Sequence, residues 1–470
     1  MFRAIKTSLW TLKIALPKVA VGWMFALLTI DFNRVAIVEL GVAAIVVTTL
    51  LSIHYLFAPF QVIAGRIADK HPLWGFRRTP YLLAASLIAS LLFLLLPGVT
   101  LAMESGGPLA LFNAVILFAC FGICMAVTAD SYHSLIAENT KKEHRAAIIA
   151  VVWIVMILST ILSAVVMNAV RPEFTPEAMQ RLYNLTPLVV LGAVLIGVVG
   201  FEKRLNPQEI QKARARALAI TPPGNPLRAS MRLLRSNRQA GLFFTFVGCA
   251  IFALFLQESL LEVLGAEVFD ASIQDTTRYQ PTWGGGILLG MIVMGCLSSI
   301  WRVPKETLTL IGCATAALGF LLLATVALFR LEQMLIPTLF CMGICAGIFN
   351  VGALAIMMEM TVEGATGLYM GLWGVAQAIG MGTSSIVAGG LHTALIGSGF
   401  IQANSAYGLI FSLEGGLLLA AAFLFSKVNI DQFQRLASGL NDNGNDNGND
   451  NGSGKDDEND RNILDVATAG

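Results

Sequence analysis

The chain contains twelve apolar runs, each close to the length of a helix that crosses a lipid bilayer. A bilayer core of roughly 30 Å is spanned by about 20 apolar residues in helical conformation. Hydrophobic residues make up 56% of the 470 residues and charged residues 13%, which leaves too little polar surface for a water-soluble globule. The sequence therefore predicts an all-α integral membrane protein. The twelve expected spanning helices cover residues 16–30, 36–58, 81–97, 109–135, 146–168, 185–200, 241–262, 284–300, 308–329, 334–358, 367–390 and 407–425.

Positive charge between these runs is concentrated on one side. With the N-terminus inside, 26 of the 31 Lys and Arg residues fall in inner segments, and the other five fall in outer loops. Lys and Arg accumulate in cytoplasmic loops when membrane segments are inserted. The charge pattern therefore predicts that both termini are cytoplasmic.

A short motif recurs at equivalent places in the two halves of the chain. Cys-Phe-Gly-Ile-Cys at 120–124 is followed, 221 positions later, by Cys-Met-Gly-Ile-Cys at 341–345. At the same displacement Glu138 corresponds to Glu359. With six runs on each side of a long basic segment, the repeat indicates duplication. Two parallel six-helix repeats of this kind resemble the major facilitator fold.

These features divide the chain into five expected regions. The basic segment holds nine Lys and Arg residues and four prolines, which favours a cytoplasmic linker. The C-terminal tail repeats Asn-Asp-Asn-Gly three times and has nothing to bury, so we expect it to be disordered. The regions are an amphipathic N-terminal segment (1–15), an N-terminal half (16–201), the linker (202–239), a C-terminal half (240–427) and an acidic tail (428–470).

The sequence shows no pattern typical of catalysis or of metal binding. All seven cysteines fall within predicted spans, without a disulfide framework or a zinc spacing. A Gly-Lys-Ser/Thr phosphate loop is missing. The basic residues follow the inner membrane face, which favours lipid as a partner and disfavours nucleic acid. We therefore expect neither an enzyme nor a tightly bound cofactor.

Between the second and third runs lie a glycine, an acid four residues later, a basic residue, a second glycine and paired cations. The pattern resembles the loop signature of the major facilitator superfamily, with an insertion at 71–74 before the second glycine. That insertion, together with residues 33–41, 57–60 and 77–81, resembles the PucC-type bacteriochlorophyll-delivery branch over about residues 5–430. The signature residues are Gly65, Asp69, Lys70, Gly75, Arg77 and Arg78.

The resemblance implies a membrane carrier or assembly factor that delivers chlorophyll-type pigment to light-harvesting or photosystem complexes. It implies chlorophyll or a precursor as cargo, and partners among the subunits of those complexes and the enzymes of chlorophyll synthesis. It places the protein in a photosynthetic membrane, thylakoid or intracytoplasmic, or in the plasma membrane. Two alternatives are a proton-coupled transporter of another amphiphilic solute and an assembly scaffold that transports nothing.

The signature loop predicts a conformational latch. Gly65 would let its helix approach a neighbour closely. Asp69 would accept bonds from a helix N-terminus, or pair with Arg77 or Arg78. Such contacts would stabilise one of two rocking states. The alternative is that these residues, with Lys70 and Gly75, only set the topology of the loop.

Ionisable residues within spans are costly and mark candidate functional sites. Asp130 and His133 stand one helical turn apart. They would relay a proton, or His133 would ligate the magnesium of a chlorin; the alternative is a satisfied polar pair between helices. His54 is a second candidate ligand, and its alternative is a buried, hydrogen-bonded histidine.

Asn33, Arg34 and Glu39 cluster around the predicted turn between the first two runs. An Arg34–Glu39 pair would fasten this hairpin, which is a structural role. The family resemblance also makes the cluster a candidate outer gate.

Two glutamates in the C-terminal half, Glu258 and Glu414, are candidate pigment or proton sites. Glu258 and Glu262 lie one turn apart toward the outer end of the seventh run. Unpaired like charges repel, so one of them would bind a proton or an arginine such as Arg34. Glu414 lies closer to the middle of the last run, which is normally peripheral in this fold.

Overall fold

The apolar runs form helices whose side chains pack into two cores, one in each half of the chain. The computed structural model describes residues 10–140, 142–206, 208–211, 234, 237–301, 303–360, 366–399 and 401–437. The helices of the N-terminal half are α2 (Pro17–Ala26), η1 (Leu27–Phe32), η2 (Val35–Glu39), α3 (Ala44–Leu56), α4 (Phe60–Lys70), α5 (Thr79–Met103), α6 (Pro108–Asn139), α7 (Lys142–Val170), α8 (Pro176–Tyr183) and α9 (Thr186–Val198).

The C-terminal half repeats this arrangement of six long helical segments, with short helices at its turns. Its elements are α12 (Arg238–Phe255), η3 (Gln257–Ser259), α13 (Leu261–Phe269), α14 (Ile273–Thr276), α15 (Tyr279–Trp301), α16 (Lys305–Leu328), α17 (Glu332–Glu359), α18 (Thr366–His392), η4 (Thr393–Gly397), α19 (Ala403–Phe425) and α20 (Ile430–Ala437). The described residues contain no β-strand, and the predicted fold class is confirmed.

Eleven of the described helices are long and apolar enough to cross a membrane. The shorter apolar helix α3 supplies the twelfth span together with α4. Pro59 separates the two, because proline has no N–H to donate and disfavours helical conformation in the residue before it. The second predicted run, 36–58, is also not one helix, because residues 36–39 belong to η2 and α3 begins only at Ala44.

The first span extends further than the sequence predicts. It continues beyond Ala26 through two π-helical segments, η1 and η2, and ends at Glu39. The turn follows at Gly41, whose φ of +65° is a conformation that glycine adopts readily. The predicted turn around Asn33, Arg34 and Glu39 is therefore wrong: these residues belong to the helical segment itself.

The glycine at the centre of each repeated motif makes an equivalent close contact. A methyl group at Gly122 of α6 would lie 2.9 Å from the Cα of His54 in α3. A methyl group at Gly343 of α17 would lie 3.0 Å from the Cα of Gly286 in α15. In each half, the fourth span thus packs against the second at this motif. The repeat has a structural reason, which is close approach of two backbones.

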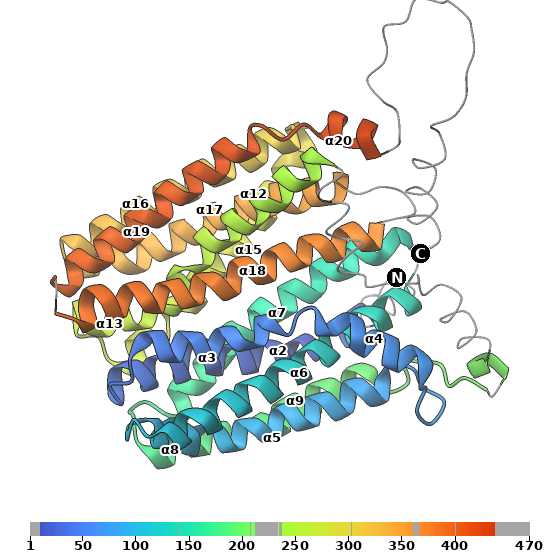
Figure 1. Ribbon diagram of the computed structural model, residues 1–470, viewed down its shortest axis with the longest axis horizontal. Coiled ribbons are helices and arrows are strands. Elements are labelled where there is room, and N and C mark those ends of the chain that lie inside the picture. The colour runs from blue at the N-terminus through green and yellow to red at the C-terminus, as the bar shows by residue number, and fades with distance from the viewer. Residues whose placement is uncertain are drawn as a thin grey trace, which may run out of the picture.

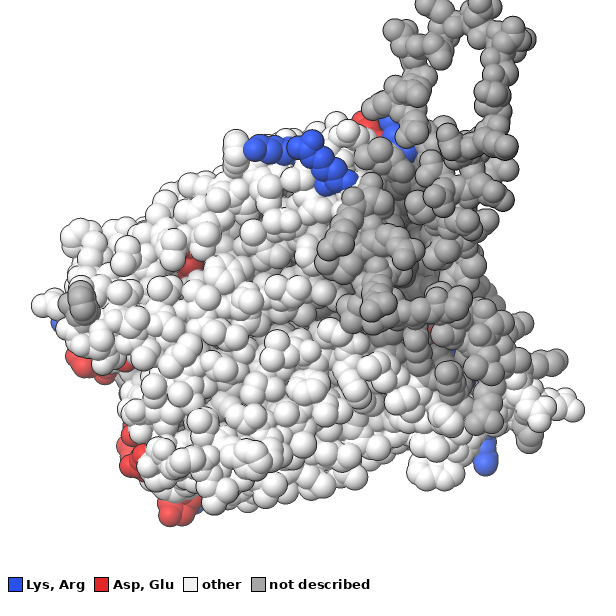
Figure 2. Space-filling view, viewed as in Figure 1, with Lys and Arg blue, Asp and Glu red and all other residues white. Residues whose placement is uncertain are grey.

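The halves lie side by side along their length (Figure 1). Helix α18 packs along α3, and α15 packs against α7. We call the end of the bundle that carries residues 201–206 and Arg238 the linker end. The opposite end, which carries residues 40–43 and 270–272, is the distal end. On the face drawn in Figure 2, most of the surface between the two ends is uncharged, apart from a group of Lys and Arg atoms on the upper edge, and acidic residues gather at the distal end.

Two predicted regions differ from the structure or fall outside it. Residues 430–437, assigned by sequence to the disordered tail, form the helix α20. Phe433 of this helix is fully buried in the C-terminal core, and that burial stabilises the helix. The rest of the tail, residues 438–470, and most of the basic linker lie outside the described residues, as do residues 1–9 of the amphipathic segment.

Candidate functional site

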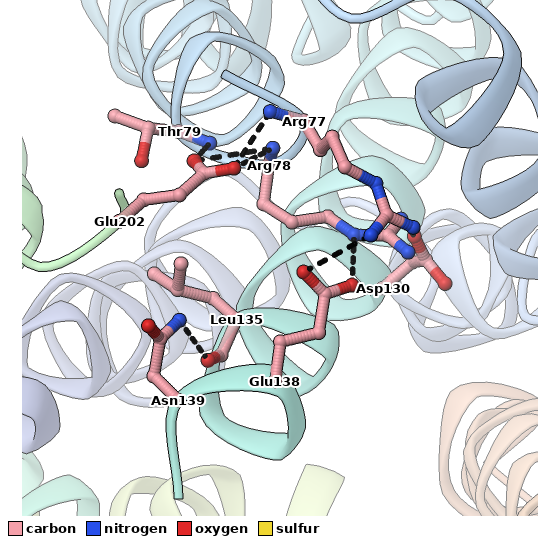
Figure 3. Close-up of polar contacts among 8 residues, drawn as sticks. All are labelled: Arg77, Arg78, Thr79, Asp130, Leu135, Glu138, Asn139 and Glu202. Carbon is pink, nitrogen blue, oxygen red and sulfur yellow. Dashed lines mark hydrogen bonds and ion pairs between the residues drawn. The ribbon is translucent and has the colours of Figure 1, made fainter. Parts of the chain in front are cut away.

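Arg78 is the centre of a polar network at the linker end, between the start of α5 and the end of α6. Its side chain is only 5% exposed. The Nε donates to Glu138 Oε1 at 3.1 Å, and Nη1 lies 3.4 Å from Asp130 Oδ2. Arg77 Nη1 lies 3.6 Å from the other carboxylate oxygen of Glu138. Figure 3 shows both carboxylates of α6 turned toward the Arg78 guanidinium, so one cation holds two acids.

Glu202, just after the last span of the N-terminal half, caps the N-terminus of α5. Its carboxylate accepts hydrogen bonds from the backbone N–H groups of Arg77 at 2.6 Å, Arg78 at 3.1 Å and Thr79 at 2.7 Å (Figure 3). The first N–H groups of a helix have no intrahelical partner and favour negative charge. Glu202 therefore fixes the start of α5, where both arginines of the network lie.

Gly65 and Gly75 let the neighbouring segments approach this network. A methyl group at Gly65 of α4 would lie 2.7 Å from Asp130 Oδ1, closer than a carbon–oxygen contact allows. Gly75 has a φ of +85°, and its carbonyl accepts the N–H of Leu205 at 2.8 Å. The structure thus brings together four of the six predicted latch residues: Gly65, Gly75, Arg77 and Arg78. The side chains of Asp69 and Lys70 lie outside the described residues.

The predicted pair of Asp130 and His133 has diverging environments. Asp130 turns toward Arg78, whereas His133 is exposed and its ring lies beside Tyr132, with 5.8 Å between centroids. These placements favour Asp130 as part of the latch. The proton relay and pigment ligation by His133 stay predictions.

At the distal end, a cluster of polar residues joins the two halves. Asn33 Nδ2 donates to the carbonyl of Ser259 at 2.8 Å. Arg34 pairs with Glu39, and its Nη2 donates to the carbonyl of Ala271 at 3.1 Å. The predicted outer-gate residues therefore lie where the first span meets α13 and η3. We call these residues, with Glu258 and Glu262, the distal cluster.

A small cavity, with an empty volume of about 300 Å³, lies between the halves beside the distal cluster. It is bounded by the first span and α3 on one side and by η3 and α18 on the other. Two of its residues, His54 and Glu258, are candidates named by the sequence. The remaining lining residues are Phe25, Leu28, Thr29, Leu51, Tyr55, Ser259 and Ser385.

One ring nitrogen of His54 makes no hydrogen bond to the described residues and can act as a ligand. Its Nδ1 lies 2.6 Å from the carbonyl oxygen of Leu51. A carbonyl oxygen can only accept, so Nδ1 carries the proton and Nε2 keeps its lone pair. The ring lies 3.8 Å from that of Tyr55 and 6.1 Å from that of Phe121, measured between centroids. A neutral imidazole oriented by a backbone carbonyl is typical of a metal ligand.

Closure of the distal end depends on Gly389, and we expect Gly389→Ala to weaken it by about 1–3 kcal/mol. An added methyl group would overlap Thr48 Oγ1 and lie 2.7 Å from the carbonyl oxygen of Ala44. A cysteine at Ser259 in a cysteine-free background, labelled with a membrane-impermeant maleimide, should then react several-fold faster.

Gly390→Ala is the matched control, because its methyl group would meet only Ile45 Cδ1 at 3.5 Å, an ordinary contact. Equal labelling rates for the two variants would contradict the role of Gly389.

The sequence profile of one known family matches residues 31–433 of the chain. That family is described as "PUCC protein". The chain belongs to the PUCC family. This confirms the predicted resemblance, and the latch and the distal cluster both fall within the matched region.

Two relatives with similar sequences come from Rhodobacter capsulatus. The "Bacteriochlorophyll synthase 44.5 kDa chain" of Rhodobacter capsulatus is 29% identical over 434 residues, which cover 88% of this chain and 94% of the relative. The "Protein PucC" of the same organism is 23% identical over 426 residues, covering 87% and 90% of the two chains.

Solved structures with the same fold are transporters. A D-xylose-proton symporter superposes with a TM-score of 0.67 at 14% identity, covering 90% of this chain and 98% of the symporter. The nucleoside transporter NupG gives a TM-score of 0.66 at 14% identity, covering 89% and 98%. At this identity the likeness concerns the fold alone, and it shows a PUCC-family chain with the architecture of a major facilitator.

The structure also places two charged groups that the sequence analysis did not assign to any site. Asp31 and Arg171 form an ion pair, with side chains 1% and 3% exposed. Asp31 lay just past the end of the first predicted run, and Arg171 was assigned to an outer loop, so no pattern in the PUCC-family sequence joined them. Glu414, in contrast, is fully buried in α19, and neither of its carboxylate oxygens has a hydrogen-bond partner among the residues that the structure describes.

Proposed function

We propose that this PUCC-family protein carries or hands over a chlorophyll-type pigment during assembly of light-harvesting or photosystem complexes. The observation that carries the proposal is His54, whose free Nε2 belongs to a residue lining the cavity between the halves. Nitrogen ligands of this kind bind the magnesium of a chlorin axially. A relative named for bacteriochlorophyll supports the same cargo class.

The chemical character of the cavity lining suits such a cargo, and the halves would have to move apart to make room for it. Leu28, Leu51, Phe25 and Tyr55 supply apolar and aromatic surface around the imidazole, and Glu258 supplies one ionisable group. Ligand sites are typically apolar pockets with a few oriented polar groups. The distal end is closed by contacts between the halves, so a pigment would enter from the linker end or sideways between helices as the cavity widens.

The proposal includes an orientation and a location. The linker end is the cytoplasmic face, because Lys and Arg dominate the segments there. The membrane is a photosynthetic one, and the acceptors of the pigment are subunits of light-harvesting complexes or photosystems. The protein acts as a carrier and not as an enzyme, in keeping with the transporter fold of its structural neighbours.

We expect His54→Ala to lower the affinity for a magnesium chlorin by at least about tenfold, since the axial ligand is lost. Titration of the purified full-length protein in mild detergent with chlorophyllide, followed by absorption spectroscopy, measures this. A magnesium-free chlorin is the matched probe, because it has no metal to ligate and should bind both proteins equally. His71→Ala, at an exposed histidine outside the cavity lining, is the control variant.

Equal losses for the magnesium and magnesium-free pigments would remove His54 as the ligand while leaving pigment carriage in place. No chlorin binding at all, with normal assembly of pigment-protein complexes after deletion of the gene, would refute pigment delivery. Retained capture of partner subunits by variants that bind no pigment would instead favour the assembly scaffold.

A further inference from the structure

The distal cluster contains a fully buried carboxyl group that no hydrogen bond satisfies. Glu262 of α13 is 0% exposed, and within the described part of the chain neither of its carboxylate oxygens has a side-chain or backbone group of another residue as hydrogen-bond partner. Both amide atoms of Gln257, also 0% exposed, lack one too. So do Asn33 Oδ1 and Arg34 Nε, on the facing helix of the other half.

Unsatisfied polar atoms of this kind are rare in the interior of proteins, and each costs free energy. Here they gather on both sides of one contact between the halves. When the distal end is closed, these polar atoms have no hydrogen-bond partner; when it is open, water can bind them. The closed state therefore has a higher free energy unless another interaction lowers it. A proton on Glu262 is such a compensation, because it removes the much larger cost of burying an unpaired carboxylate.

The charges around Glu262 leave it without a dedicated counter-ion. Arg34 interacts electrostatically with its carboxyl group, but the guanidinium is already paired with Glu39. Glu258 adds a second acid one turn away, with a side chain 6% exposed. The elements packed against α13 carry further titratable groups: Asp275 of α14, which accepts from Ser272; Tyr279 of α15; and, on α19, Tyr407, which donates to Glu267, and the buried Glu414.

We propose that Glu262 is a proton-binding site that couples protonation to closure of the distal end. In the closed state the carboxyl group holds a proton. When the halves separate at the distal end, water reaches Glu262 and accepts that proton. The remaining carboxylate is stabilised by water and by Arg34. Closure requires a proton to be taken up again from the same side.

The coupling predicts how the ratio of open to closed molecules changes with pH, both in direction and in steepness. Because the closed state binds the additional proton, the ratio of open to closed molecules rises with pH. One coupled proton changes that ratio by up to about tenfold per pH unit, and two coupled protons, with Glu258 as the second site, by up to about a hundredfold. The coupling supplies a driving force for movement of the halves and is independent of the identity of the cargo.

The distance between spin labels across the distal end tests the proposal. Asn168 and Gln274 lie on opposite halves, where Asn168 Nδ2 donates to the carbonyl of Gln274 at 3.2 Å, and the Asn168 side chain is partly exposed. Cysteines at both positions, in a full-length chain whose native cysteines are replaced, are labelled and measured by pulsed electron resonance in lipid vesicles between pH 5 and pH 9. We expect the long-distance population to grow with pH.

Glu262→Gln keeps the shape of the side chain but cannot ionise, so it should hold the distal end closed and remove most of the pH response. Glu262→Asp retains a titratable group and should restore the response. Glu414→Gln is the matched control, because Glu414 is an equally buried, unsatisfied carboxyl group in α19. A difference infrared spectrum between wild type and Glu262→Gln should show the loss of one protonated carboxyl band in the closed state.

The proposal is overturned if the distance distribution does not change with pH, or if Glu262→Gln responds to pH as the wild type does. It is also overturned if Glu414→Gln removes the response and Glu262→Gln does not. Melting temperatures of the variants show whether each remains folded. Since no pigment is added in these measurements, their outcome is separate from the outcome of the pigment titration.

Discussion

Replacing Asp31 with alanine is expected to lower the free energy of unfolding by about 3–5 kcal/mol. Its partner Arg171 is 3% exposed and would be left as an uncompensated charge inside the N-terminal half. Leaving this charge unpaired costs more free energy than the ion pair contributes to stability, because the interaction with Asp31 offsets the desolvation of the Arg171 guanidinium. Unfolding of the purified protein in mixed micelles by a denaturant measures the loss.

The double variant Asp31→Leu with Arg171→Met separates the two effects. Removing both charges together should cost clearly less than removing Asp31 alone, because no unpaired charge remains. The exposed pair of Lys203 and Glu209, with side chains 79% and 36% exposed, is the control. Lys203→Ala should cost no more than about 1 kcal/mol. If Asp31→Ala costs as little as this control, the buried pair contributes nothing measurable.

Arg78→Ala should give the second large loss, about 2–4 kcal/mol, because it leaves Asp130 and Glu138 facing each other without their shared cation. The range is lower than for Asp31, since Asp130 is 19% exposed and Glu138 33% exposed, and water screens them in part. The same unfolding measurement applies. Arg78→Lys should recover only part of the loss, since an ammonium group cannot reproduce the guanidinium fork.

Arg77→Ala is the matched control for Arg78. The Arg77 side chain is 24% exposed, and its Nη1 lies 3.6 Å from Glu138 Oε2. We expect a loss of less than about 1 kcal/mol. The double variant Arg78→Ala with Asp130→Asn should be more stable than Arg78→Ala alone. If it is not, Asp130 and Arg78 are not energetically coupled, and the network is not held by that pair.

The sequence did not predict the acidic partners of the latch arginines, because these partners lie far from the loop in the chain. Gly65, Arg77 and Arg78 stood out because they lie within one loop. Glu138 and Glu202 bind Arg78 from positions 60 and 124 residues away. No local pattern could connect them, because hydrogen bonding to a helix start depends on where another span ends in space.

The boundaries of the first span show a different reason for a wrong prediction. The run was ended at residue 30 because Asp31, Asn33 and Arg34 are polar. In the structure Asp31 lies in the π-helical segment η1, and Asn33 and Arg34 continue the helix between η1 and η2. They face other helices, where Asp31 has a buried counter-charge and Asn33 a backbone acceptor. Polar residues end a membrane helix where their side chains would face lipid. Here the side chains face other helices of the protein.

The sequence by itself determined the fold class, the duplication and the family, because hydrophobic length, charge asymmetry and short motifs are properties of the chain read in order. Only the tertiary structure decided which charges meet. It pairs Arg78 with two acids of α6, encloses Asp31 with Arg171, and leaves Glu262 buried between the halves without a hydrogen bond. These interactions depend on distance and on the exclusion of water, and both are set by packing between helices distant in the chain.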